Sequence, residues 1–220
     1  MIFDLAGYAE KFCQLPEPEE FAKKCEQLRN FLCEVNQTTN LTRITEKEDF
    51  NIKHAADSLG LLRCFQQLYL QKLQIADLGC GAGFPSLILA LACPHWQITA
   101  IDSTGKKVNF VRQAAEYLQL PNLTAIHGRI NELNRKNEFK FKFDVVTARA
   151  VATSDSLAKD ASNFPAKQGT FIFYKTPGQA EEEMPRLTVS CKNFQWSITE
   201  SYQLPQDAGT RLFVTGKRIR

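Results

Sequence analysis

The pattern of apolar and polar positions predicts helices first and then a regular alternation of strands and helices. Residues 4–15 and 18–36 are predicted helices, and in the second one the apolar residues recur at steps of three and four. Thr45 is expected to start another helix, with Glu48 completing a capping box, and residues 65–70 are expected to end this part. The beginning of the chain is therefore predicted to be entirely helical.

Short apolar runs bounded by turn residues follow. They predict parallel strands over residues 73–78, 97–101, 123–127, 143–147 and 169–174, helices over 86–93, 105–118, 154–164 and up to about 187, and an antiparallel pair over 196–203 and 211–216. Residues 134–142, between the third and fourth strands, are basic and are expected to be flexible. The alternation predicts an α/β fold with a doubly wound, mostly parallel sheet and an antiparallel C-terminal strand. We expect a small helical lobe over residues 1–70 and the sheet domain over 71–220, joined as a single compact unit.

Three alternate glycines, Gly79, Gly81 and Gly83, follow the first predicted strand and precede an apolar stretch of helical length. A strand, a glycine turn and a helix bring bare backbone N–H groups close to a ligand at the helix N-terminus. Asp77 precedes the glycines and is expected to be free to face that ligand. The spacing is G-x-G-x-G rather than the G-x-G-x-x-G of dinucleotide folds, which makes a nicotinamide enzyme less favoured. A tight turn without a ligand is the alternative.

Asp102 ends the second predicted strand, about 20 residues after the glycines. An acid at this position can accept hydrogen bonds from ribose hydroxyls. Alternatively, Asp102 only caps the helix that follows. The ordered set of strand, acid, glycines, helix, strand and acid favours a cofactor that contains a nucleoside.

Charged residues gather where the predicted strands end. Asp77, Asp102, Arg129, Arg149 and Lys175 all stand at or just past such an end, the edge at which open α/β sheets bind ligands. Arg149 lies so close to a buried strand that its charge needs a partner, and a structural ion pair with Asp77 or Asp102 is the alternative to a functional role. Three cations and two acids favour an anionic substrate that meets a partly charged cofactor.

His54 and Asp57 share one face of a predicted helix with the apolar residues Phe50 and Leu61, because steps of four, three and four stay on one stripe. A polar pair within an apolar stripe is either a satisfied internal hydrogen bond or part of a cleft. The pattern leaves both possibilities open.

Composition limits the class of protein. The chain has 220 residues and is 44% hydrophobic, enough for one α/β core with a small extra lobe. It has no run of 18 uncharged apolar residues and no basic, apolar start typical of a signal peptide. Seven scattered cysteines without a Cys-x-x-Cys pair disfavour zinc and disulfide frameworks and are typical of a reduced, cytoplasmic protein. No metal and no membrane contact are expected, and the net charge of +3 neither requires nor excludes nucleic acid.

Several motifs resemble known proteins. Asp77-Leu78-Gly79-Cys80-Gly81-Ala82-Gly83 with Asp102 resembles motifs I and II of class I S-adenosylmethionine methyltransferases. A narrower set, spread over residues 30–216, resembles the GidB/RsmG family of bacterial rRNA guanine-N7 methyltransferases. It comprises Asn40-Leu41-Thr42, Lys53-His54-Ala55-Ala56-Asp57-Ser58, Gly83-Phe84-Pro85, Asp102-Ser103, Lys106-Lys107-Val108, Arg129, Arg149-Ala150, Lys175 and Arg211. The chain departs from the family at Ile130-Asn131, where Val-Glu or Ala-Glu is usual.

The resemblance implies a Rossmann-like class I methyltransferase fold and methyl transfer from S-adenosylmethionine to N7 of a guanine in 16S rRNA. It implies that the cofactor is lined by Asp77, Gly79, Gly81, Gly83, Phe84, Asp102, Ser103, Thr104, Ile130, Asn131 and Arg149, the last near the methionine carboxylate. Arg149, Arg129, Arg211 and Lys175 are the expected catalytic residues, and His54, Asp57, Lys106, Arg129, Lys175 and Arg211 the expected RNA-facing ones. Lys217, Arg218 and Arg220 are further candidates for phosphate contacts. The expected partner is small-subunit rRNA or the ribosomal subunit, bound by a monomer.

Two alternatives stay open at this point. One is a class I methyltransferase that acts on a small molecule or a protein, which predicts activity without RNA. The other is a non-catalytic RNA- or ribosome-binding module, which predicts no cofactor binding. The intact glycine loop with Asp102 argues against the module, and the basic residues argue against a small apolar substrate.

Overall fold

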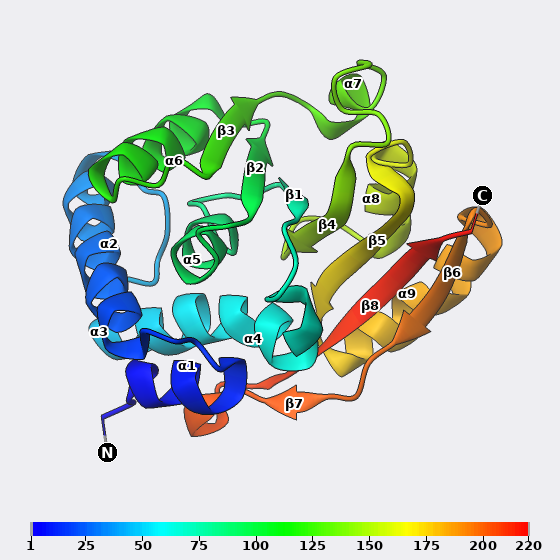
Figure 1. Ribbon diagram of the computed structural model, residues 1–220. Helices are drawn as coiled ribbons and strands as arrows, with labels where there is room; N and C mark the ends of the chain where they lie inside the picture. The colour runs from blue at the N-terminus through cyan, green and yellow to red at the C-terminus, as the bar shows by residue number, and fades with distance from the viewer. Residues whose placement is uncertain (1, 220) are drawn as a thin grey trace.

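The predicted alternation of strands and helices forms one sheet in the computed structural model, which describes residues 2–219. The strands span Gln74–Leu78 (β1), Gln97–Asp102 (β2), Leu123–His127 (β3), Phe143–Arg149 (β4), Pro165–Lys175 (β5), Phe194–Ile198 (β6), Tyr202–Gln203 (β7) and Thr210–Arg218 (β8). They are ordered β3-β2-β1-β4-β5-β8-β6, and β7 pairs with β8 (Figure 1). Strands β1 to β5 pair in parallel, whereas β8 is antiparallel to its neighbours, which confirms the doubly wound, mostly parallel α/β sheet.

Helices cover both faces of the sheet. They span Leu5–Cys13 (α1), Pro18–Thr39 (α2), Lys47–Phe50 (α3), Asp57–Cys64 (α4), Ser86–Ala92 (α5), Gly105–Tyr117 (α6), Ile130–Leu133 (α7), Ser154–Asp160 (α8) and Pro177–Ser190 (α9). Short 3₁₀ turns lie at Gln66–Leu68 and Pro205–Asp207. Within residues 2–219, none of these helices has the length and apolar character that a membrane crossing requires.

Alternation along the strands sorts the core into two clusters. Ile75 and Val145 pack into a cluster with the helices α1, α2, α4, α5 and α6. Their chain neighbours Ala76 and Val146 point to the opposite face and pack into a second cluster with α8 and α9. Because the first cluster contains residues of the N-terminal helices and of the sheet, the helical lobe and the sheet share one core.

The helical stretch from Lys47 to Cys64 differs from the regular helix that the sequence predicts. Its middle, Asn51–Ala56 (η1), is π-helical, between α3 and α4. The predicted capping box is wrong, since the N-cap is Glu46 and makes no side-chain cap. Glu48 instead accepts hydrogen bonds from the Phe3 backbone N–H, at 3.3 Å, and from Gln206 Nε2, at 2.6 Å. Single π-helical turns are rare in proteins, and those that occur are frequently found at functional sites.

Further boundaries differ from the prediction. Most of residues 134–142 are exposed, but Phe139 within them is buried and stacks against Phe164 at 5.7 Å between ring centroids. The predicted helix over 154–164 ends at Asp160, and β5 begins earlier, at Pro165. The predicted strand over 196–203 is divided into β6 and β7, both of which pair with β8.

Candidate active site

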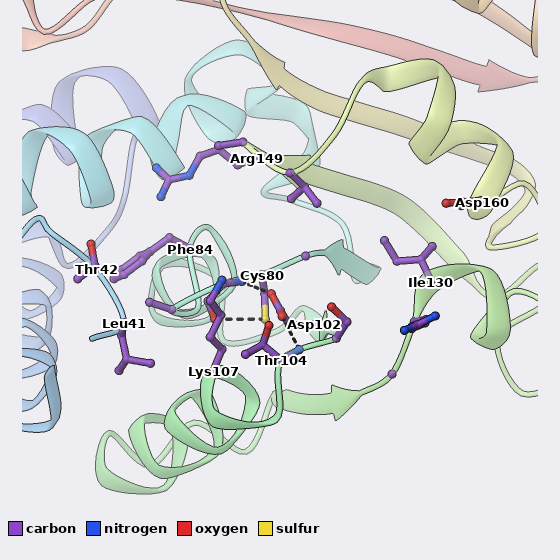
Figure 2. Close-up of a pocket in the computed structure, with 18 of the residues that line it drawn as sticks. Leu41, Thr42, Cys80, Phe84, Asp102, Thr104, Lys107, Ile130, Arg149 and Asp160 are labelled. Atoms are coloured by element: carbon purple, nitrogen blue, oxygen red, sulfur yellow. Dashed lines mark hydrogen bonds between the residues drawn. The ribbon is translucent and has the colours of Figure 1, made fainter. Parts of the chain in front are cut away.

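A cavity of about 660 Å³ opens at the carboxyl ends of the parallel strands, where the fold predicts a ligand. It is lined by Gly79 to Ala82 and Phe84, by Asp102 to Thr104 with Lys107, by Gly128 to Asn131, by Arg149 to Val151, by Asp160, and by Leu41, Thr42 and His54 of the helical lobe; Gly83, expected to line the cofactor, is not part of this lining. Figure 2 shows Leu41 and Thr42 on one side of the cavity and Ile130 on the other, with Asp102 between them. The structure thus brings together most of the residues that the sequence singled out.

The glycine loop has the geometry that its spacing predicts. Gly79, Gly81 and Gly83 have φ angles of +66°, +57° and +87°, a region that favours glycine. A Cβ at Gly79 would lie 2.6 Å from the Val151 side chain, and one at Gly83 would collide with Leu87. A Cβ at Gly81 would meet nothing within 4 Å. Gly81 therefore leaves its side of the cavity open to a ligand.

Asp102 joins the glycine loop to the start of α6. Its Oδ2 accepts a hydrogen bond from the Gly81 N–H at 2.9 Å, and its Oδ1 accepts one from the Thr104 N–H at 2.8 Å. Thr104 is the N-cap of α6 and, among residues 2–219, no side chain caps that helix, so Asp102 orients the residue before the helix instead of capping it. The carboxylate also lines the cavity, and each oxygen has a second lone pair for a ligand hydroxyl.

Asp77 does not face the cavity, contrary to the expectation from its position before the glycines. Its side chain is 1% exposed beneath the loop, and Oδ2 accepts a hydrogen bond from the Ser86 hydroxyl. Oδ1 has no hydrogen-bond partner among residues 2–219. Burial raises the pKa of Asp77 to about 6, although the bond from Ser86 and the charge of Arg149 oppose that shift. In this structure Asp77 supports the first turn of α5 instead of meeting a ligand.

Arg149 contacts the helical lobe rather than Asp77 or Asp102, so both acids proposed as its ion-pair partners are wrong. Its Nη1 lies 3.0 Å from Asp57 Oδ2 and donates to the Lys53 carbonyl at 2.9 Å. The other oxygen of Asp57 pairs with Arg211 Nε, also at 3.0 Å. One buried carboxylate therefore holds two guanidinium groups that come from β4 and β8.

His54 completes this group as a neutral side chain. Burial, reinforced by the nearby charge of Arg149, lowers the pKa of His54 to about 3. Its Nδ1 lies 3.1 Å from Arg149 Nη2, which can only donate, and its Nε2 lies 3.4 Å from Thr42 Oγ1. The ring stacks on Phe84 with 3.9 Å between centroids. His54 is thus both a satisfied internal residue and part of the wall of the cavity.

Lys175 is not placed to meet a phosphate. Its side chain is 7% exposed, pairs with Glu183 at 2.9 Å and donates to the Ala152 carbonyl at 3.0 Å. Although burial alone raises the pKa of Glu183, hydrogen bonds from Ser154 and Lys175 bring it below its ordinary value. The sequence does not reveal Glu183 as the partner of Lys175, because a turn separates the two residues and Glu183 is one of three adjacent glutamates in α9. Lys175 fastens the loop after β4 to α9.

The remaining basic candidates are spread over two edges of the sheet. Arg129 is exposed at the mouth of the cavity, and Lys106 donates to the Thr39 carbonyl at 3.0 Å from the start of α6. Lys217 and Arg218 lie at the end of β8, which is antiparallel to β5, and therefore at the opposite edge from the cavity. Arg220 lies outside the described residues. The expected phosphate contacts of this basic end at the site are not supported by its position.

Asn36, which the sequence did not single out, holds the wall of the cavity formed by Leu41 and Thr42. The side chain of Asn36, in the last turns of α2, accepts hydrogen bonds from the N–H groups of Leu41, at 2.6 Å, and Thr42, at 3.0 Å. It also donates to the Thr42 carbonyl at 3.0 Å. The signal in the sequence is the run of polar turn-forming residues from Asn36 to Asn40, of which Asn40 has a positive φ of 49° in the structure.

Comparison with known proteins decides the family. Residues 22–206 match the family described as GidB, rRNA small subunit methyltransferase G. The chain belongs to the GidB family. GidB relatives named ribosomal RNA small subunit methyltransferase G occur in Lachnoclostridium phytofermentans, 36% identical over 87% of this chain and 78% of the relative, and in Staphylococcus saprophyticus, 37% identical over 83% and 76%. The predicted family, and with it a methyltransferase that uses S-adenosylmethionine, is confirmed.

Solved structures agree at the level of the fold. A SAM-dependent O-methyltransferase from Thermotoga maritima superposes with a TM-score of 0.58 at 15% identity, over 86% of this GidB chain and 71% of that one. The TYW2 protein of M. jannaschii in complex with AdoMet gives a TM-score of 0.52 at 17% identity, over 70% and 79%. The Rossmann-like class I methyltransferase fold of this GidB protein is therefore shown.

Proposed function

We propose that this chain transfers the methyl group of S-adenosylmethionine to N7 of a guanine in 16S rRNA. The observation that carries the proposal is the cavity itself, in which the glycine loop and Asp102 lie together with Arg149, whose partner Asp57 also holds Arg211. The printed names of the relatives, rRNA small subunit methyltransferase, supply the class of substrate.

The residues present fit the cofactor. Gly81 leaves room where a Cβ would otherwise stand, and Asp102 offers carboxylate lone pairs to ribose hydroxyls. Ile130 and Asn131 line the side of the cavity expected for adenine, with Ser103 and Thr104 next to Asp102. The neutral amide of Asn131 can hydrogen-bond where the family usually has a glutamate. We assign the methionine end to Gly79, Phe84 and Arg149.

Bound S-adenosylmethionine would supply a methyl group on a positively charged sulfur. Guanine N7 carries an in-plane lone pair and no proton, so the attack needs no general base. The chain therefore has to align N7 with the methyl group and exclude competing geometries, and a rigid site is sufficient for this. The fixed loop, the His54–Phe84 stack and the paired arginines provide that rigidity.

We assign RNA contacts to Arg129, which lines the cavity, to Lys106 at the start of α6 and to Arg211 beside Asp57. Phosphate contacts of this kind position RNA without reading its sequence, while N7 becomes accessible where RNA is irregular or single-stranded. Action as a monomer, on free rRNA or on a ribosomal subunit, stays a prediction. It is supported by the fact that the cofactor-facing residues and Arg129 line one cavity of one chain.

The test is transfer of a radiolabelled methyl group from S-adenosylmethionine to small-subunit rRNA that lacks N7 methylation. Naked 16S rRNA and assembled small subunits are tested in parallel, and the label is mapped by chain cleavage at 7-methylguanosine. We expect one labelled guanine in one of the two substrates. If the cofactor binds but neither substrate accepts label, a small-molecule or protein substrate is favoured instead. If the cofactor does not bind, the non-catalytic module is favoured.

A further inference from the structure

The Asp57 carboxylate lies between two arginines that are far from it in sequence. Arg149 is 92 residues away and Arg211 is 154 residues away, yet each lies 3.0 Å from a different oxygen of Asp57. The Asp57 side chain is 6% exposed, against 13% for Arg149 and 23% for Arg211. The most buried member of the group is therefore the acid, and the arginines extend from it toward more open positions.

All of the hydrogen bonds described for the Arg149 side chain end on one helical stretch. They reach the Lys53 carbonyl, His54 Nδ1 and Asp57 Oδ2, across the boundary between η1 and α4. A guanidinium has five N–H donors, and these bonds use three of them. Within the described part of the chain, the Arg149 Nε–H has no partner. The helical stretch thus holds the Arg149 side chain in place, and its remaining N–H donors are available to a ligand in the cavity that it lines.

The group also carries an excess positive charge. Among the side chains in direct contact, two guanidiniums and one carboxylate leave one positive charge, because His54 is neutral next to them. Buried ionic groups are often no more stabilising than apolar residues of similar size, so stability alone does not explain such an arrangement. A positive group with unused planar donors suits a carboxylate or a phosphate.

We propose that Asp57 is a positioning residue for methyl transfer. Its carboxylate sets the orientation of both guanidiniums, so that Arg149 directs its unused donors at the cofactor and Arg211 directs its own at the RNA. The proposal rests on the proposed function, and it gives the π-helical segment a role. By placing the Lys53 carbonyl, His54 and Asp57 around one guanidinium, the segment lets the helical lobe determine the geometry of the cavity.

The experiment compares wild type with Asp57→Asn, which keeps the shape and removes the charge. We expect kcat to fall about 10- to 100-fold, as misplaced groups near a reacting centre do. RNA affinity should be unchanged or higher, and the plot of log affinity against log salt should become steeper by up to about one unit, because an arginine is released. A merely structural residue would instead lower RNA affinity and melting temperature together and leave the salt slope unchanged.

Asp49→Asn is the matched control. It removes the same charge from the same helical stretch, but Asp49 pairs with Lys53 at the surface, so kcat and salt slope should stay within about twofold. Combined with Arg211→Gln, Asp57→Asn should be non-additive in kcat, because both changes break one contact. Wild-type kcat in the Asp57 variant, an equal loss in the Asp49 variant, or an additive double variant overturns the inference.

A second variant covers the case in which Asp57→Asn does not fold. Asp57→Glu keeps the charge and displaces it by one methylene. Reduced kcat with retained RNA affinity supports the inference, and wild-type kcat overturns it. Inactivity of the wild type on every RNA would instead count against the proposed function, so the two failures are distinguishable.

Discussion

Two carboxylates are buried with basic partners near the carboxyl ends of the parallel strands, and they are used differently. Glu183, on α9, faces one cation, Lys175, and its Oε2 also accepts hydrogen bonds from the Ser154 N–H, at 2.8 Å, and from the Ser154 hydroxyl. Asp57 faces two cations and accepts no hydrogen bond from a neutral group within the described chain. The pair of Glu183 and Lys175 therefore has no net charge, whereas Asp57 with its two arginines is positive and has unused N–H donors.

This difference separates structural from functional basic residues. Lys175 and Arg149 both follow from the sequence as cations at strand ends, and both are largely buried. Only the partner tells them apart. The charge of Lys175 is balanced by one acid, and its ammonium already donates to that acid and to a carbonyl. Arg149 shares its acid with a second arginine, so positive charge and N–H donors remain for a ligand.

The strongest way to break the comparison is Lys175→Met. It leaves Glu183 buried without its ammonium, so the free energy of unfolding should fall by about 3–5 kcal/mol. Denaturant titration measures this, and calorimetry should show cofactor affinity within about twofold of wild type for the folded fraction. The double variant Lys175→Met with Glu183→Leu should recover most of the loss. A single variant with normal stability and lost RNA methylation would make Lys175 a functional residue.

The two groups should also titrate in different pH windows, which overlap only below about pH 4.5. The pKa of His54 falls from 6.5 to about 3 in the folded state, so unfolding gains a proton there and stability drops as the pH falls from about 6.5 toward 3, by about 1.4 kcal/mol per pH unit. The lowered pKa of Glu183 makes its contribution disappear only below its ordinary value of 4.5.

Denaturant titration across this range checks the windows. His54→Gln should remove its share of the slope between pH 6.5 and 4.5, and Glu183→Gln should change the profile only below 4.5. Asp77, with its pKa raised to about 6, acts in the opposite sense, since its contribution to stability is lost as the pH rises through about 6. Variants are therefore compared with wild type at each pH. Identical profiles for His54→Gln and wild type would contradict the neutral, buried histidine.

The smallest expected effect comes from the glycine loop, where a Cβ at Gly81 would meet open space and a Cβ at Gly83 would meet the Leu87 side chain. Gly81→Ala places a Cβ in open space, so it should cost only about 1–2 kcal/mol of stability from the positive φ. It should nevertheless weaken cofactor binding, because the methyl group enters the space assigned to the ligand. Gly83→Ala, the matched variant, collides with Leu87 and should lose stability more than affinity. Equal effects of the two changes on affinity would remove Gly81 from the binding surface.

Local patterns in the sequence predict what local physics determines. The strand positions, the glycine turn and Asp102 follow from apolar runs, glycine spacing and the strand-end rule, and the structure places them together. The partner of Arg149 did not follow, because Asp57 lies 92 residues away and no periodicity joins the two. The π-helical turn was not predicted either. Over only six residues, an α-helix and a π-helix produce the same spacing of apolar positions.

The place of β8 in the sheet has a consequence for how the protein is made. Among the strands of residues 2–219, β6 pairs with β8 alone, and β8 lies between β5 and β6 although it comes last in sequence order. Arg211 reaches Asp57 from this strand, across 154 residues. During synthesis the glycine loop and Asp102 can therefore form while the ribosome is still adding residues, but the paired arginines cannot. A growing chain would complete its cofactor loop early and its charged group only near the end of translation.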